Sequence, residues 1–179
     1  MQRGFEIVSK YADKGIKLPY RTTQQAAGYD FECAEDFTLP SIWRHDLLHA
    51  FKPLRHREQL TTAELTAGNH DLTPWLVPTG IKAYMRPGEV LMLANRSSNP
   101  LKHHLILPNG VGIIDADYYN NEKNEGEIFV QLVNVGLQDV VIKKGQRIAQ
   151  GLFMPYLLAD GEQIPEQRRT GGFGSSDRN

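Results

Sequence analysis

Glycine and proline divide this chain of 179 residues into short segments, and this punctuation constrains the fold more than any other feature. The 16 glycines and 10 prolines separate apolar runs that have the length of strands rather than helices. The runs lie at residues 81–85, 90–94, 105–107, 127–135, 140–142 and 147–153. Short strands with turns between them indicate an all-β sandwich or barrel. We expect one domain, residues 1–179, because this length is typical of a single core.

Two segments depart from the β pattern. Residues 41–76 predict a partly helical insertion, because an amphipathic stripe runs up to Pro53 and a capping-box pattern begins at Thr61. Residues 159–179 end in polar and glycine-rich sequence, which indicates a flexible C-terminal arm. The insertion carries four of the six histidines, but their spacing fixes no third zinc ligand, so a solvated, charged insertion is the favoured interpretation. These histidines are His45, His49, His56 and His70.

Composition excludes several classes of function. A net charge of -1 argues against binding to nucleic acid or to a membrane surface, both of which favour a basic excess. The single cysteine, Cys33, cannot form an internal disulfide and fits a reducing compartment. No apolar run reaches the ~20 residues of a membrane span, and the first residues have no signal-peptide pattern. We therefore expect a cytoplasmic protein.

The segment at residues 112–118 begins with apolar residues and ends with two carboxylates and an aromatic ring. Asp115 and Asp117 would share one face of an extended strand, whereas Tyr118 would lie on the other face. To bring the ring and a carboxylate to one substrate, the chain must turn or bulge here, and residues 109–112 supply the backbone freedom. Neighbouring carboxylates are suited to activating water, although a polar hairpin tip would have the same sequence.

Two further segments are suited to binding phosphate. Residues 95–98 follow an apolar strand and present Arg96 with two hydroxyls, although a plain turn explains them equally well. Residues 168–176 combine arginine, glycines whose amides can surround phosphate, and Phe173, which could stack on a base. A disordered tail is the alternative for this second segment.

Taken together, the segments resemble the trimeric deoxyuridine triphosphatases (dUTPases). All five motifs of that family have counterparts in order, at residues 27–31, 96–98, 109–118, 145–153 and 168–176. The resemblance implies the family's β-clip fold, a distorted jelly-roll or β-sandwich-like barrel. It also implies hydrolysis of dUTP to dUMP and pyrophosphate, which limits uracil in DNA and supplies dUMP.

The resemblance assigns roles to individual residues. Asp115 would be the general base that activates the attacking water, and Tyr118 would lie against the deoxyribose and reject ribonucleotides. The uracil would bind in a hairpin, where it would contact Asn109, Gly112, Ile113 and Ile114, and also Phe129 on the returning strand. The phosphates would contact Arg96, Ser97, Ser98 and Gln150, with Arg168, Gly174, Ser175 and Ser176 closing over them and Phe173 stacking on the base. Magnesium would bind mostly through phosphate oxygens, with Asp30 reaching it through water.

The resemblance also implies a homotrimer with shared sites and an arm from another chain. The sequence departs from the family in three places, one of which is Asp177, which follows the two serines where the family commonly has a glycine. Seven residues, 119–125, stand where the family commonly has one, and residues 41–76 replace a short connection. Two alternatives remain open: a deaminase acting on dCTP, and a regulator that binds a protein partner through residues 41–76. That insertion carries exposed-looking aromatic residues with no role in the chemistry.

Overall fold

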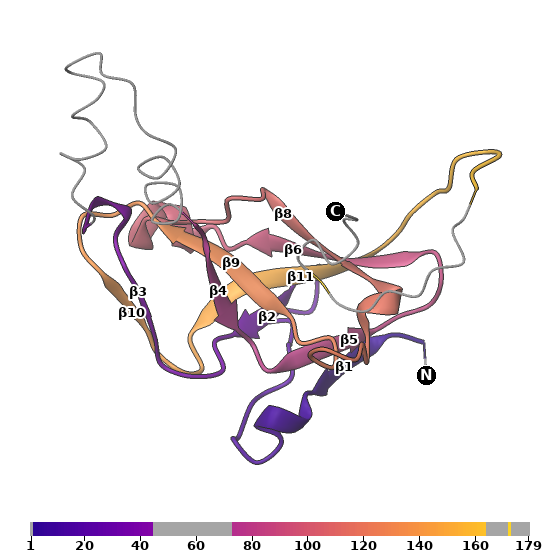
Figure 1. Cartoon of the computed structure of the whole chain (residues 1–179), viewed down its shortest axis with the longest axis horizontal. Helices are drawn as coiled ribbons and strands as arrows, with labels where there is room; N and C mark the ends of the chain where they lie inside the picture. Colours follow the sequence, from indigo (N-terminus) through magenta and orange to yellow (C-terminus); the bar gives the residue numbers. More distant parts are fainter. Residues whose placement is uncertain (1, 45–72, 164–171, 173–179) are drawn as a thin grey trace, which may run out of the picture.

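The computed structural model describes residues 2–44, 73–163 and 172, and these form an all-β architecture (Figure 1). Short helical turns occur at Ser9–Tyr11, Ile42–Arg44, Asn99–His103 and Ala116–Tyr118. The strands are β1 (Gly4–Ile7), β2 (Tyr29–Glu32), β3 (Phe37–Leu39), β4 (Trp75–Pro78), β5 (Ile81–Tyr84), β6 (Glu89–Asn95), β7 (Leu105–Ile106), β8 (Val111–Asp115), β9 (Phe129–Asn134), β10 (Val140–Ile142) and β11 (Arg147–Pro155).

The strands pair into four antiparallel sheets. The largest has the order β2-β11-β6-β8, and a second has the order β4-β9-β7; β1 pairs with β5 and β3 with β10. The prediction of an all-β fold is confirmed, and each of the six apolar runs contains a strand. One expectation was wrong: β8 and β9 do not form a hairpin, because they belong to different sheets.

The core forms where the sheets face one another. Strand β9 illustrates the pattern, because Val130 and Leu132 are buried while Phe129, Gln131 and Val133 are half-buried on the other face. Leu91 and Leu93 of β6 and Phe31 of β2 complete the same buried cluster. Alternation along each strand therefore leaves a second row of side chains free to line a site.

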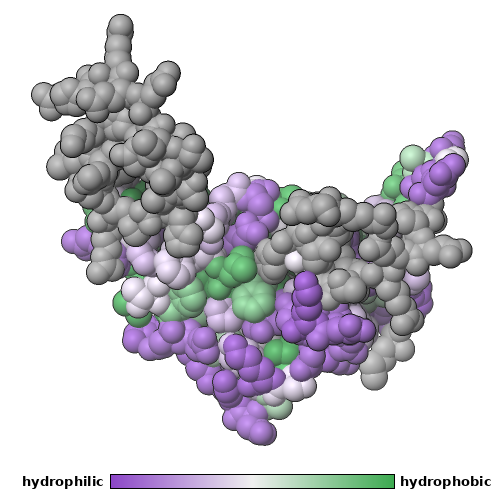
Figure 2. Space-filling view, viewed as in Figure 1, coloured by the Kyte–Doolittle hydropathy of each residue, from purple (hydrophilic) through white to green (hydrophobic). Residues whose placement is uncertain are grey.

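Both ends of the expected insertion are built into the β framework. Ser41 bridges to Asn134, the indole Nε1 of Trp43 donates to the carbonyl of Val135 at 2.9 Å, and β4 begins at Trp75. Figure 2 shows hydrophobic residues gathered in the region of β4 and β9. The first expected helix is described only at Ile42–Arg44, which form a 3-10 turn; its remainder, the second expected helix and the four histidines lie outside the described residues. Within the described ranges, no helix is long and apolar enough to cross a membrane.

Candidate functional site

Strand register aligns three of the sequence motifs in one row. Asp30 of β2 pairs with Gln150 of β11, Gln150 pairs with Ala94 of β6, and Ala94 pairs with Val111 of β8. Residues directly opposite one another on neighbouring strands project to the same face of the sheet. The four-stranded sheet is therefore the scaffold that joins motifs far apart in the sequence.

A charged cluster lies at one end of this row. Asp30 is buried, and its two carboxylate oxygens accept from Arg96 Nε at 3.1 Å and Arg147 Nη1 at 3.0 Å. Arg96 Nη1 also donates to the carbonyl of Arg147 at 3.2 Å. Among the described residues, Arg96 Nη2 has no hydrogen-bond partner. Two guanidinium groups on one carboxylate leave an excess positive charge, which favours an anion.

Neighbouring polar residues position Gln150 in the same cluster. Gln150 Nε2 donates to the carbonyl of Asn95 at 3.2 Å, and a Cβ at Gly28 would lie 2.8 Å from Gln150 Oε1. The glycine is therefore required for the amide to lie where it does. Ser97 is exposed and Ser98 half-buried, at the turn that follows β6. The structure thus brings together four predicted phosphate residues: Arg96, Ser97, Ser98 and Gln150.

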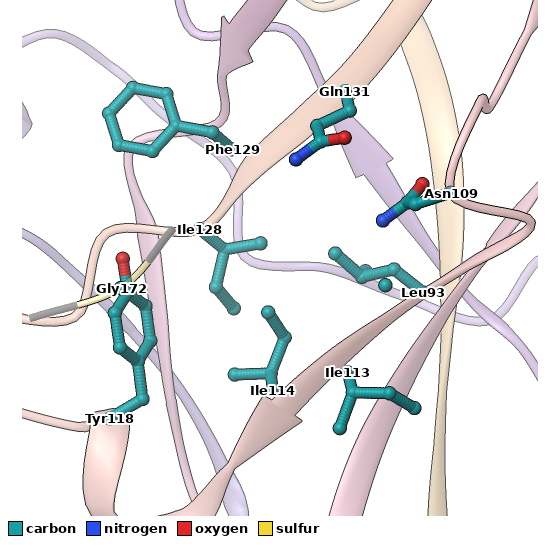
Figure 3. A pocket seen from close by; sticks show the side chains of 10 residues that line it. Leu93, Asn109, Ile113, Ile114, Tyr118, Ile128, Phe129, Gln131 and Gly172 are labelled. Atoms are coloured by element: carbon teal, nitrogen blue, oxygen red, sulfur yellow. The ribbon is translucent and has the colours of Figure 1, made fainter. Parts of the chain in front are cut away.

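A pocket of about 160 Å³ lies between β8 and β9 (Figure 3). A cavity of about 150 Å³ accommodates one benzene ring, so this pocket has the size for a single six-membered ring. Apart from Phe173, which lies outside the described residues, it contains every residue that the sequence assigned to uracil, and also Tyr118. Its lining is Leu93, Asn109, Gly112, Ile113, Ile114, Tyr118, Ile128, Phe129, Gln131 and Gly172.

The predicted turn after the carboxylate is present. Strand β8 ends at Asp115, and Ala116–Tyr118 form a 3-10 turn. Asp115 is half-buried, Asp117 is exposed, and Tyr118 is buried with 4% of its surface accessible. Because the chain turns here, ring and carboxylate need not follow strand alternation.

Within one chain, Asp115 is remote from the charged cluster. Asp115 pairs with Val90 near one end of β6, whereas Arg96 directly follows the other end. Six residues of strand at ~3.3 Å each separate these positions by about 20 Å. One chain therefore presents two half-sites, a pocket with a carboxylate and a cluster of cations.

Of the expected C-terminal arm, the structure describes residues 159–163 and Gly172. A Cβ at Gly172 would lie 2.8 Å from Tyr118 Cε2, so this glycine packs directly on the tyrosine ring. The other predicted arm residues, Arg168, Phe173, Gly174, Ser175 and Ser176, lie outside the described residues. The expectation that another chain supplies the arm stays a prediction.

Sequence reasoning missed several residues of the site. Gln131 lies two residues after Phe129 on the same face of β9, so strand periodicity could have indicated it. Figure 3 shows it at the same end of the pocket as Asn109. Arg147 lies within a recognised motif but was not singled out. Asn124, which contacts Tyr118, had no sequence signal because its role depends on the folded loop.

Two buried ionisable groups lie outside this constellation. Burial raises the pKa of the Cys33 thiol to about 11, which keeps it protonated and unreactive at neutral pH. Burial also raises the pKa of Glu127, whose Oε1 has no hydrogen-bond partner among the described residues. Neither group reaches the pocket lining.

Comparison with known proteins agrees with the geometry. The family model for dUTPase matches residues 61–177, well over half of the chain. The deoxyuridine 5'-triphosphate nucleotidohydrolase of Lactococcus lactis is 46% identical over 175 residues, which is 97% of each protein. That of Desulfitobacterium hafniense is 32% identical over 169 residues, covering 92% of this chain and 89% of the relative.

Solved structures match in the same way. The crystal structure of the Streptococcus mutans dUTPase superposes with a TM-score of 0.68 and 43% identity, covering 88% of this chain and 99% of the other. The dUTPase of Staphylococcus aureus phage phi11, at 17% identity and a TM-score of 0.61, shares the fold. With matches along nearly its whole length, this chain belongs to the dUTPase family and is a dUTP diphosphatase.

Proposed function

We propose that Asp115 is the general base of dUTP hydrolysis. In the proposed step, a water oxygen bonds to the α-phosphorus and the bond from that phosphorus to the bridging oxygen breaks. Asp115 takes the proton of the water, and the products are dUMP and pyrophosphate. The observation that carries this proposal is the half-buried Asp115 at the end of a strand that lines a ring-sized pocket.

The uracil occupies the pocket between β8 and β9. Its lining is mostly apolar, with the amides of Asn109 and Gln131 at one end, which suits a flat ring with polar edges (Figure 3). Leu93, Ile114 and Ile128 leave little room for a methyl substituent on the ring, so thymine is excluded by size. Tyr118 lies at the other end and meets the deoxyribose.

The triphosphate binds the cluster around Arg96, together with Ser97, Ser98, Gln150 and the arm residues Arg168, Ser175 and Ser176. The excess positive charge around Asp30 supports this assignment. Magnesium, bound mainly through phosphate oxygens, would neutralise charge on the triphosphate. A carboxylate offers about four acceptor positions, so Asp30 can accept from both arginines and still hold a magnesium-bound water.

A homotrimer completes the site. Because Asp115 and Arg96 flank opposite ends of β6, about 20 Å of strand apart, one substrate cannot be served by both half-sites of one chain. A neighbouring copy that presents its cation cluster to the pocket solves this problem, and Phe173 of an arm would then cover the uracil. We place the enzyme in the cytoplasm.

The variant Asp115→Asn tests the proposed base. The amide is nearly the same size but cannot accept the proton, so we expect turnover to fall by at least the ~100-fold typical of general-base loss. Binding of a non-hydrolysable dUTP analogue should be retained, as measured by calorimetry. Asp117→Asn, at the exposed neighbouring carboxylate, is the matched control. Comparable losses in both variants, or near-normal turnover of Asp115→Asn, would remove Asp115 from this role.

A second, coexisting function is suggested by the insertion. Trp43 and Trp75 are each 46% exposed where the insertion joins the β framework, and hydrolysis does not require them. We propose that this region binds a protein partner. Deleting residues 45–72 should leave dUTP turnover intact while abolishing that interaction. A deletion variant that loses turnover instead would assign the insertion to the enzyme itself.

A further inference from the structure

We propose that Asn124 is a positioning residue that fixes the Tyr118 ring and thereby sets the discrimination between deoxyribose and ribose. The inference rests on the proposed function, in which Tyr118 meets the sugar. It gives a role to the long 119–125 loop, at the point where the chain departs most from the family pattern near the site.

The hydroxyl of Tyr118 is held by two partners. It donates to the carbonyl of Glu127 at 2.9 Å and accepts from Asn124 Nδ2 at 2.7 Å. The amide orientation of Asn124 is defined by its other end, because Oδ1 accepts from the backbone N–H of Gly126 at 3.1 Å and from Asn121 Nδ2 at 2.8 Å. Nδ2 must therefore face the tyrosine.

Asn121 fixes the loop from within. Its Nδ2 donates to the carbonyl of Tyr118 at 2.9 Å, and its Oδ1 accepts from the backbone N–H groups of Lys123 and Asn124 at 3.1 and 3.2 Å. Asn121 is buried, so these bonds are shielded from water. The loop consequently holds both the backbone and the hydroxyl of Tyr118.

The loop is also attached to the body of the protein. Lys82 Nζ of β5 donates to Asn120 Oδ1 at 2.7 Å, and the backbone N–H of Ser9 donates to Glu125 Oε2 at 3.2 Å. The hydroxyl of Tyr119 donates to Glu6 Oε2 of β1 at 2.7 Å. These contacts tie the loop to the β1–β5 sheet, so it cannot move away from Tyr118 as a unit.

A fixed ring is what steric discrimination requires. The 2′-hydroxyl of a ribonucleotide is rejected only if the Tyr118 ring cannot move away from it. A tyrosine ring without hydrogen bonds at its hydroxyl could tilt and make room. Gly172 packs against the same end of the ring that Asn124 and Glu127 hold, because a Cβ there would lie 2.8 Å from Cε2 and 3.3 Å from the hydroxyl oxygen. Without the Asn124 contact, the ring gains freedom, and a ribonucleotide is accommodated at lower cost.

The test is the ratio of kcat/KM for dUTP to kcat/KM for UTP. It is measured under single-turnover conditions, so that slow UTP hydrolysis is detected. For Asn124→Ala we expect the ratio to fall by about three- to tenfold, the equivalent of one lost hydrogen bond. Tyr118→Phe removes this contact together with the hydrogen bond to the carbonyl of Glu127, so the ratio should fall at least as far. The double variant should fall no further than Tyr118→Phe, because the Asn124 contact is already lost in that variant.

Asn120→Gly is the matched control. Asn120 lies in the same loop, and its positive φ of 56° suits a glycine. The variant loses the contact with Lys82, but residue 120 does not touch the Tyr118 hydroxyl. Its ratio should equal that of the unmodified enzyme. If Asn124→Ala and Tyr118→Phe lower the Tm but keep the ratio, Asn124 is structural only and the inference fails while the proposed function stands. Absence of dUTP hydrolysis by the unmodified enzyme would overturn both.

Discussion

Gly126 and Gly88 form a natural pair for separating backbone strain from crowding. Both have a positive φ, 82° and 81°, which disfavours any residue with a Cβ. A Cβ at Gly126 would lie 2.6 Å from the carbonyl oxygen of Tyr118 and 3.0 Å from Tyr119 Cα, whereas a Cβ at Gly88 meets nothing within 4 Å. The neighbours of Gly126 are backbone atoms, so they cannot rotate away.

The expected losses follow from these contacts. Gly88→Ala should cost only the left-handed backbone penalty, about 1–2 kcal/mol. Gly126→Ala should cost that amount plus about 1–3 kcal/mol for overpacking. At about 2–4 °C per kcal/mol for a chain of this size, its Tm should be lower than that of Gly88→Ala by about 2–12 °C.

Differential scanning calorimetry of both variants at one protein concentration measures this difference. Urea denaturation provides a second measurement, in which the midpoint should shift without a change in slope. Equal Tm values for the two variants would refute the reasoning, because they would mean that the loop beside Tyr118 yields to an added methyl group. That result would also weaken the argument that the loop holds the ring rigidly.

Two further predictions concern stability and the arm. Burial raises the pKa of Glu127 in the folded state. Above that pKa the buried carboxylate is ionised and lowers the free energy of unfolding. This penalty disappears as the pH falls toward about 4.3, the pKa of glutamate in the unfolded chain. Glu127→Gln should therefore raise the Tm at pH 8, and the gain should shrink on acidification; a gain independent of pH would contradict this assignment. Truncation after Glu166 should remove most of the turnover, by ~100-fold or more if the arm stabilises the transition state. Full activity of the truncated chain in a pyrophosphate-release assay would exclude a closing arm.

The sequence was sufficient for the strands that carry the site. Val90 to Ala94 and Arg147 to Phe153 are apolar runs bounded by turn residues, and both became strands of the central sheet. Strands β1 to β4 were not expected, although they are no shorter than the expected strands β7 and β10. Their pairing depends on partners such as β5, β9 and β10, which are distant in the sequence.

The pocket that we propose for uracil was predicted better than its surroundings. Six residues were identified as neighbours and do line one cavity: Asn109, Gly112, Ile113, Ile114, Tyr118 and Phe129. The hairpin expected to join them is absent, because β9 pairs with β4 and β7 instead. Sequence adjacency cannot distinguish two strands that pair from two that face each other across sheets.

Separation within the fold was also beyond the sequence. The order of the motifs gave no indication that Asp115 and Arg96 flank opposite ends of β6. Equally, residues 119–125 could be recognised as a long loop, but Asn124 acquires its role only because Gly126 and Asn121 orient its amide. Such roles depend on three-dimensional hydrogen bonding rather than on spacing.

The most direct test of the account is pyrophosphate release from dUTP, dTTP, dCTP and UTP, with magnesium and again with a chelator. We expect turnover of dUTP alone, and we expect the chelator to abolish or greatly reduce it. The pocket excludes the methyl group of dTTP, Tyr118 rejects the ribose of UTP, and the cluster around Arg96 holds the triphosphate. Release of ammonia from dCTP, or comparable hydrolysis of dTTP or UTP, would contradict the proposed arrangement of the site.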